Sequence, residues 1–147
     1  MDKLTEETLK LDNQLCFSLY ATSKEIIRRY KPLLDKFDIT YTQYITLLVL
    51  WEQDGLTVKT LGERLYLDSG TLTPLLTKLE SKGLIVKQKD TKDSRETTIY
   101  LTGKGCELKE KITVVPASMG ACVKLDFDDF VLLQKLLRKV RNGLTGE

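Results

Sequence analysis

The stretch "LTVKTLGERLYLDSGTLTPLLTKLESKGLI", residues 56–85, decides the fold, because it predicts two short helices separated by a turn. Leucine and valine recur at helical spacing, so each helix has one apolar side. These positions are Val58, Leu61 and Leu65 in the first helix and Leu72, Leu75, Leu76 and Leu79 in the second. Ser69, with Asp68 just before it, is the expected N-cap of the second helix, and Gly83 is expected to end it. Pro74 falls about one turn into that helix, where the loss of an amide donor is tolerated or bends the helix slightly.

A basic β-hairpin follows these helices directly. The runs "LIVKQK" (84–89) and "ETTIYLT" (96–102) are alternating and rich in β-branched residues, and a polar turn over residues 90–95 separates them. Helix, turn, helix and hairpin together predict a mainly α winged helix-turn-helix with a small β-hairpin wing. In that fold the second helix enters the major groove of DNA, and the hairpin reaches the flanking minor groove or the backbone.

The predicted second helix has a polar face opposite its leucines. A projection at 100° per residue places on it Gly70, Thr73, Pro74, Thr77, Lys78 and Ser81. Small hydroxyls and one lysine would allow a close approach to base edges. An ordinary solvated helix surface is the alternative interpretation.

The hairpin carries the basic side chains Lys87, Lys89, Lys92 and Arg95 in or near its turn. A flat arginine side chain suits the narrow minor groove, and Asp93 could hold that guanidinium in place. Residues 57–95 carry 8 basic and 5 acidic side chains, a mild excess that supports nucleic-acid binding only weakly. Solubilising turn charges are the alternative. The candidate DNA-binding residues are Ser69, Thr71, Thr73, Thr77, Lys78, Lys89, Lys92, Asp93 and Arg95.

Amphipathic helices are expected before this region. The first, over residues 5–34, has an apolar stripe so wide that it needs a partner, in the same chain or in a second copy. The segment "ITYTQYITLLVLW" then predicts a central, buried helix that begins with a capping box of Thr40 and Gln43.

Two further helices are expected after the hairpin. Thr102 is the expected cap of the first, which should end near Pro116, and Asp126 is the expected cap of the second. The last helix carries an apolar series at helical spacing: Phe127, Phe130, Leu133, Leu137 and Val140. A chain of 147 residues is long enough to form one domain with a proper core, so we expect a single domain over residues 1–147.

The composition excludes several classes of function. With 41% hydrophobic and 30% charged residues, the chain is typical of a soluble globular protein. The absence of histidine excludes Ser-His and Cys-His catalysis and the usual catalytic zinc sites, and three widely spaced cysteines offer neither a disulfide scaffold nor a metal clamp. We expect no enzyme of common type, no cofactor and no metal. Without a signal-peptide pattern or an apolar run of roughly 18 to 20 residues, a cytoplasmic location is expected.

The order of these elements, together with the "DSR" of the hairpin turn (a D-x-R pattern), resembles the MarR family of winged-helix regulators over essentially the whole chain. Four stretches resemble its organic-hydroperoxide-sensing branch, the OhrR group: "QLCFSLY", "YKPLLDKFDITYTQY", "LTVKTLGERLYLDSGTLTPLL" and "KLESKGLI". The resemblance implies a homodimer built from the terminal helices, about residues 1–35 and 102–147. The winged helix-turn-helix, about residues 36–101, would bind near-palindromic operator DNA, one half-site for each subunit. It also implies a repressor that releases DNA when organic hydroperoxides oxidise an N-terminal cysteine.

By this resemblance Cys16 is the sensing cysteine, and Tyr30 and Tyr41 are the tyrosines that hydrogen-bond its sulfur from the partner subunit. Tyr20 is expected near Cys16 on the same helix face by its i, i+4 spacing. Since no histidine is present, phenol hydroxyls and a helix N-terminus must stabilise a thiolate here, and Thr40 and Tyr41 open such a helix. A buried, inert cysteine is the alternative.

Cys122, in "GACVKL", lies close to where two-cysteine members of the group keep their resolving thiol. The resemblance therefore implies that Cys122 captures oxidised Cys16 in a disulfide, while one-cysteine members use a small thiol instead. Plain burial of Cys122 is the alternative. Cys106 matches no family position, and we expect inert packing or surface exposure for it.

Other functions are consistent with parts of the same sequence. A broader oxidation-sensing global regulator of virulence or biofilm genes would share the sensor but control other genes. A drug-binding regulator would not need Cys16. The basic wing argues against a thiol peroxidase, and so does the lack of a Thr-x-x-Cys arrangement.

Overall fold

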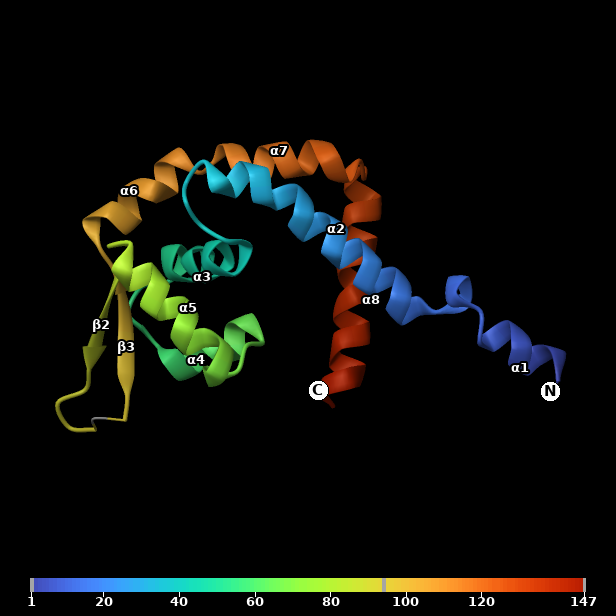
Figure 1. The fold of residues 1–147 in the computed structure, drawn as a ribbon, viewed down its shortest axis with the longest axis horizontal. Coiled ribbons are helices and arrows are strands. Elements are labelled where there is room, and N and C mark those ends of the chain that lie inside the picture. The colour runs from blue at the N-terminus through green and yellow to red at the C-terminus, as the bar shows by residue number, and fades with distance from the viewer. Residues whose placement is uncertain (1, 94, 147) are drawn as a thin grey trace. The chain divides into compact units, whose positions relative to one another are not determined.

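The computed structural model describes residues 2–93 and 95–146, so Ser94, the middle of the "DSR" pattern, lies outside the described residues. The chain divides into two compact units, of which the first ends at Val115 and the second begins at Pro116. The first unit contains α1 (Lys3–Thr8), η1 (Leu11–Asn13), α2 (Leu15–Asp35), α3 (Tyr41–Glu52), β1 (Leu56–Thr57), α4 (Val58–Leu65), α5 (Ser69–Ser81), β2 (Ile85–Lys89), β3 (Thr97–Leu101) and α6 (Gly103–Lys111) (Figure 1). Helix α7 (Val114–Val123) spans the boundary, and α8 (Phe127–Thr145) lies in the second unit.

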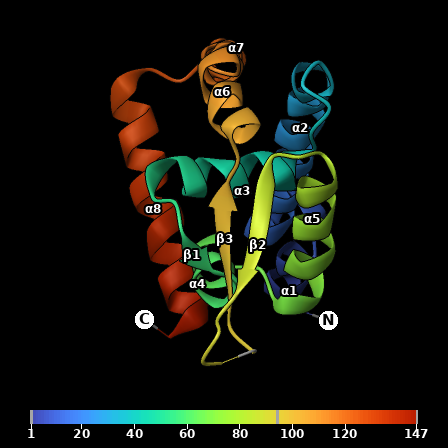
Figure 2. The ribbon, with the colours of Figure 1, turned by 90° about the vertical axis from the view of Figure 1, so that its left-hand side faces the viewer.

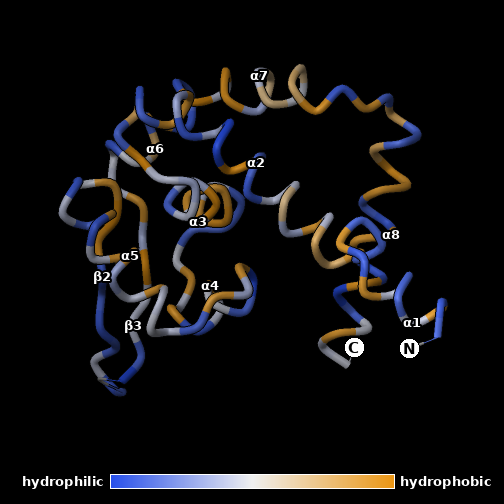
Figure 3. The backbone as a smooth tube through the Cα atoms, turned by 45° about the vertical axis from the view of Figure 1, so that its right-hand side comes forward, coloured by the Kyte–Doolittle hydropathy of each residue, from blue (hydrophilic) through white to orange (hydrophobic). Residues whose placement is uncertain are grey.

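The core of the first unit includes α3, and the residues of this helix are among the most hydrophobic in Figure 3. Tyr44, Leu47 and Leu50 of this helix are buried, which confirms the prediction of a central helix. Leu61 of α4 and the four predicted leucines of α5 are buried in the same core, while Val58 and Leu65 pack against it partly exposed. The apolar spacing of the sequence therefore predicted the inner sides of both helices correctly.

Three antiparallel strands form the wing, in the order β1-β3-β2 (Figure 2). The predicted hairpin is confirmed, with β2 and β3 paired from Ile85–Leu101 to Lys89–Thr97. Strand β1 was not predicted, because two residues are too few for an alternating pattern. Its pairing of Leu56 with Ile99 attaches the start of α4 to the hairpin.

Polar side chains begin the helices mostly where the sequence predicted. Thr40 Oγ1 accepts from the Gln43 N–H at 3.3 Å, and Gln43 Oε1 accepts from the Thr40 N–H at 3.1 Å, so the capping box of α3 is confirmed. Thr102 caps α6 and Asp126 caps α8, again as predicted. Gly83 follows α5 with a φ of +72°, a left-handed conformation that glycine adopts without a Cβ penalty.

The prediction of Ser69 as the N-cap of α5 is wrong. Asp68 is the cap, because its carboxylate accepts from the Thr71 N–H at 2.8 Å, and Ser69 is the first helical residue. A carboxylate in this place also interacts favourably with the positive end of the helix dipole.

The prediction of one helix over residues 5–34 is also wrong, because the chain breaks into α1, η1 and α2. The backbone is extended at Lys10 and Gln14, and the side-chain amides of Asn13 and Gln14 donate to carbonyls of the preceding turn. Such side-chain bonds compete with helical ones. As a result Cys16 is the second residue of α2, in its first turn.

The helix predicted from Thr102 to Pro116 is likewise interrupted. Helix α6 ends at Lys111 and α7 begins at Val114. Pro116 is the third residue of α7, where an amide N–H has no partner within the helix, so the proline is tolerated. Cys122 lies near the end of α7.

In the second unit, α8 leaves its apolar side chains largely exposed. Phe127 is 77% exposed and Leu132 is 52% exposed. The predicted apolar series is similarly accessible at Phe130, Leu133 and Leu137, while Val140 is partly buried. None of the described helices is long and apolar enough to cross a membrane.

Candidate nucleic-acid interface and redox residues

The outer side of α5 is a continuous polar surface. Its buried side consists of leucines, so the remaining positions of the helix face solvent. The exposed residues on this side include all the predicted ones: Ser69, Gly70, Thr71, Thr73, Pro74, Thr77, Lys78 and Ser81. The helix therefore presents small side chains that would permit close approach to a duplex.

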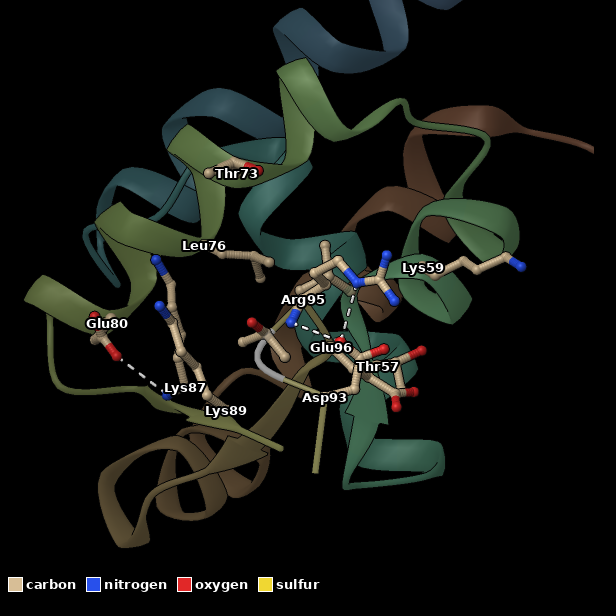
Figure 4. A pocket seen from close by; sticks show the side chains of 12 residues that line it. Thr57, Lys59, Thr73, Leu76, Glu80, Lys87, Lys89, Asp93, Arg95 and Glu96 are labelled. Carbon is tan, nitrogen blue, oxygen red and sulfur yellow. Dashed lines mark hydrogen bonds and ion pairs between the residues drawn. The ribbon is translucent and has the colours of Figure 1, made fainter. Parts of the chain in front are cut away.

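A groove of about 840 Å³ separates α5 from the hairpin and the start of α4 (Figure 4). Thr73 lines it from α5, and Lys87, Lys89 and Arg95 line it from the hairpin. Lys59 lines it from α4. Four cationic side chains thus converge on one concave surface beside the exposed helix, although Asp93, Glu80 and Glu96 are also part of its lining.

Arg95 is held by Asp93 as the sequence suggested. The Asp93 carboxylate accepts from Arg95 Nε at 3.1 Å and from the Arg95 backbone N–H at 3.0 Å. The Arg95 side chain, followed by its backbone N–H, lowers the pKa of the Asp93 carboxyl, so this carboxyl stays ionised. The Arg95 side chain is 91% exposed, which leaves the rest of its guanidinium available to a ligand.

Thr77 and Lys87 form a contact between α5 and the hairpin that the sequence did not predict. The Thr77 hydroxyl donates to the Thr73 carbonyl at 3.0 Å and accepts from Lys87 Nζ at 2.9 Å. Glu80 accepts from the Lys87 backbone N–H at 3.1 Å. Because a hydroxyl has one proton, Thr77 in this conformation has none left to donate to DNA and instead positions Lys87.

The predicted DNA-binding residues therefore fall into three groups. Thr73, Lys89, Asp93 and Arg95 share the main groove, and Ser69 lines an adjacent groove together with Arg95. Thr71, Lys78 and Lys92 are exposed but lie outside both linings, as does Thr77. Lys59 lines both grooves and was missed, because only the pairing of β1 with β3 brings the start of α4 to the hairpin.

Cys16 is exposed in the first turn of α2, so burial as a small inert hydrophobe does not describe it. Tyr20 lies one turn further on and is also exposed, with the Lys24 ammonium 5.0 Å from the centre of its ring. The first turn of a helix has free N–H groups and a positive partial charge, which favour an anion such as a thiolate.

Tyr30 and Tyr41 form a second, half-buried group at the other end of α2. Their ring centroids are 4.9 Å apart, and Tyr44 lies 5.7 Å from Tyr30. Burial raises the pKa of the Tyr30 hydroxyl, and the neighbouring Tyr41 and Tyr44 raise it further. Burial also raises the pKa of Tyr41. Both hydroxyls therefore keep their protons near neutral pH and can donate hydrogen bonds.

One chain does not bring Cys16 to these tyrosines. Cys16 and Tyr30 lie on the same continuous helix, α2, fourteen residues apart. At about 1.5 Å of rise per residue, this separation is roughly 21 Å. Of the predicted sensor residues, Tyr20 lies one turn from Cys16, while Tyr30, with Tyr41 packed on it, lies far along α2.

The other two cysteines are exposed as well, Cys106 on α6 and Cys122 on α7. Exposure of Cys106 agrees with one of the two expectations for it, and Cys122 is accessible in the single chain. Among the residues that the structure describes, no cluster of three or more His, Cys, Asp or Glu could hold a metal ion.

Comparisons of the sequence with known proteins identify regulators. The family model described as "Transcriptional regulator SarA/Rot" matches residues 28–112. The "Organic hydroperoxide resistance transcriptional regulator" of Bacillus subtilis (strain 168) is 50% identical over 129 residues, which cover 88% of each chain. The "HTH-type transcriptional regulator SarZ" of Staphylococcus saprophyticus subsp. saprophyticus is 41% identical over 139 residues, which cover 95% of each chain.

Among solved structures, the fold is similar to AbfR of Staphylococcus epidermidis. Reduced AbfR bound to DNA matches with a TM-score of 0.84 at 32% identity, over 97% of both chains. Disulfide-formed AbfR matches with a TM-score of 0.64 at 32% identity, over 99% of this chain and 97% of the other.

Proposed function

Since the chain belongs to the SarA/Rot family of transcriptional regulators, as an OhrR-like regulator of the MarR type, we propose that it is a dimeric repressor that organic hydroperoxides inactivate through Cys16. One observation carries the proposal. An exposed cysteine in the first turn of α2 occurs in the same chain as a winged-helix groove lined by four cationic side chains. The names of the Bacillus relative and of reduced, DNA-bound AbfR support the same assignment.

For the DNA complex we propose that α5 enters the major groove while the hairpin turn reaches the flanking minor groove. Arg95, held by Asp93 and otherwise free, suits the narrow, electronegative minor groove. Lys59, Lys87 and Lys89 face the same groove and would contact phosphates, which position the duplex without reading its sequence.

Replacing Arg95 by alanine should weaken operator binding by about 1 to 3 kcal/mol. The side chain is almost fully exposed and bonds to Asp93 only two residues away, so folding should be unaffected. Fluorescence anisotropy with a labelled operator duplex at matched salt measures the change, and Lys111→Ala, an exposed charge at the end of α6, is the matched control. An Arg95→Ala protein with wild-type affinity would show that the hairpin turn does not contact DNA.

For sensing we propose that the Cys16 thiolate attacks the outer oxygen of a hydroperoxide. The O–O bond breaks, the alkoxide leaves and takes up a proton to become an alcohol, and Cys16 becomes a sulfenic acid. The first turn of α2 and the Tyr20 hydroxyl support the thiolate from the same chain. Tyr30 and Tyr41 are too far along α2 to act within one chain, and we propose that they donate to Cys16 of the partner subunit.

The exposed apolar surface of the single chain supports a homodimer. In a single chain Leu15, Phe17 and Ile27 of α2 are exposed, as are Phe127 and Leu132 of α8. Exposed apolar surface on this scale marks an interaction site. We propose that residues 1–35 and 102–147 form the dimer interface around the winged helix-turn-helix of 36–101, with one such unit for each half of a near-palindromic operator.

The proposed function is tested by a gel shift with a duplex from the region upstream of the protein's own gene. Cumene hydroperoxide should release the DNA, and subsequent dithiothreitol should restore the complex, because sulfenic acids and disulfides are both reduced by thiols. Binding that is unaffected by the hydroperoxide would refute redox control, and a drug-binding regulator would then become the better explanation.

We propose that Cys122 captures the Cys16 sulfenic acid, forming a disulfide and releasing water. Its exposure makes it accessible to such a reaction, and a disulfide-formed state is known for AbfR. The oxidised samples of the gel shift, run on a non-reducing gel, should contain a covalent dimer if the bond joins two subunits. Monomers in which Cys16 carries a small thiol would contradict the assignment of Cys122.

The alternative of a broader oxidation-sensing regulator is favoured by the similarity to SarZ, which extends over 95% of both chains. The two functions share the sensor and differ only in the genes controlled. Sequencing of the genomic DNA bound by the reduced protein separates them: one or two sites adjacent to peroxide-resistance genes indicate a local repressor, and many dispersed sites indicate a global one.

A further inference from the structure

The C-terminal end of α5 is bound to the turn that precedes α3. Lys82, the C-cap residue of α5, donates through its ammonium to the Asp38 carbonyl and, at 3.2 Å, to Gln43 Oε1. The same ammonium lies 3.7 Å from the Asp38 carboxylate. The Lys82 side chain is only 27% exposed, whereas Lys89 and Lys92 are exposed, and Lys82 lines neither of the two grooves beside α5.

One of the oxygens that Lys82 contacts, Gln43 Oε1, also closes the capping box of α3. Gln43 Oε1 accepts from the Thr40 N–H as well, and the Gln43 residue is 2% exposed. Tyr41 follows Thr40 directly and packs on Tyr30 at 4.9 Å between ring centroids. A displacement of Tyr41 would therefore move the Gln43 amide and the ammonium bound to it.

The opposite side of the same corner is tied to α6. Lys104 Nζ donates to the Lys82 carbonyl at 2.8 Å, and the Thr102 hydroxyl donates to the Gly83 carbonyl at 2.5 Å. These bonds satisfy carbonyls that the end of a helix leaves free. The end of α5 is thus fixed between the start of α3 and the start of α6, with Lys82 as its connection to α3.

We propose that Lys82 is a positioning residue that couples the redox state at the Tyr30–Tyr41 pair to the orientation of α5. The inference rests on the proposed function, in which these tyrosines contact the sensing cysteine of the partner subunit. When oxidation alters that contact, the start of α3 shifts, and the ammonium transmits the shift to the end of the DNA-binding helix. Coupling of this kind requires a contiguous set of packed and hydrogen-bonded groups, which Tyr41, Thr40, Gln43 and Lys82 provide.

The test compares the operator affinity of reduced and hydroperoxide-treated protein. In Lys82→Met, which keeps the length of the side chain but has no donor, the ratio of the oxidised to the reduced Kd should fall by roughly tenfold relative to wild type. Lys111→Met, with the same loss of charge at an exposed position of α6, should keep the wild-type ratio, and Lys82→Arg, which retains donors, should recover most of it. Mass-spectrometric detection of the Cys16–dimedone adduct should show equal sulfenic acid formation in all four proteins.

The possible outcomes separate the coupling from the function on which it rests. A wild-type ratio near one overturns the proposed function and the coupling with it. If the ratio of oxidised to reduced Kd is normal in the wild type and the same in Lys82→Met, the coupling alone is overturned. If Lys82→Met binds the operator more weakly in the reduced state but keeps the wild-type ratio, the coupling is again overturned, because Lys82 then only supports binding. If Lys82→Met does not fold, Lys82→Leu, which is shorter and also has no donor, is measured in its place against the same criteria.

Discussion

Serine in place of Cys16 is expected to leave operator binding intact and to abolish its loss on hydroperoxide treatment. Serine has nearly the same shape but cannot form a sulfenic acid, and Cys16 is exposed, so the substitution disturbs no core packing. The measurement is the operator Kd by fluorescence anisotropy before and after cumene hydroperoxide. The wild-type Kd should rise on treatment, while the Kd of the variant should not change.

Cys106→Ser provides the matched control, because Cys106 is also exposed on a helix of the first unit. It should respond to hydroperoxide as the wild type does. A Cys16→Ser protein that still leaves DNA on oxidation would eliminate Cys16 as the sensor. If Cys106→Ser were the unresponsive variant, the sensing role would move to Cys106.

Alanine in place of Gly105 is expected to destabilise the protein strongly. A Cβ at this buried position would lie 2.2 Å from the Leu84 carbonyl oxygen and 3.2 Å from the Leu101 side chain. The obstacle is backbone, so α6 must move away from the end of α5, and the bond from Trp51 Nε1 to the Gly105 carbonyl, 3.0 Å long, would be strained as well. We expect the free energy of unfolding to fall by about 3 kcal/mol, the upper end of what overpacking usually costs.

Urea denaturation followed by the fluorescence of Trp51, the one tryptophan of the chain, measures this loss. The protein concentration must be matched, since the stability of a dimer depends on it. Gly103→Ala in the same helix is the control, because a Cβ there meets nothing within 4 Å, and its stability should equal or exceed that of the wild type. Equal stability of Gly105→Ala and Gly103→Ala would show that α6 does not approach Leu84 so closely.

The errors at the sequence level have local physical causes. The break before α2 was missed because the leucines continue at helical spacing through residues 9–15, while the side-chain amides of Asn13 and Gln14 bind the backbone instead. Asp68 and Ser69 are both good caps, and the sequence does not say which of two adjacent candidates has the extended backbone. Pro116 was expected near the end of a helix, although proline is equally compatible with the beginning of one.

The candidate site was predicted in part. The candidates Lys89, Asp93 and Arg95 lie together because a hairpin brings neighbouring residues together whatever surrounds it, and they share one groove with Thr73 of α5. Lys59 was not found, since its place in the groove depends on a two-residue strand that carries no pattern. Thr77 is exposed on the predicted side of α5, and its hydroxyl bonds to the Thr73 carbonyl and to Lys87, a contact that the sequence did not predict.

The amino-acid sequence alone determined the winged helix-turn-helix, because the spacing of its leucines, its caps and its hairpin alternation are local properties that each segment carries by itself. Its resemblance to the OhrR group also led to the proposal of Cys16, Tyr30 and Tyr41 as one sensor. Only the tertiary structure decided how distant segments meet: that Gly105 must lack a side chain against Leu84, and that Lys82 binds the turn before α3. It likewise decided that one continuous helix keeps Cys16 far from Tyr30. Contacts between residues tens of positions apart, and the distance between two residues on one rigid helix, both depend on how the whole chain folds. Local periodicity contains no information about them.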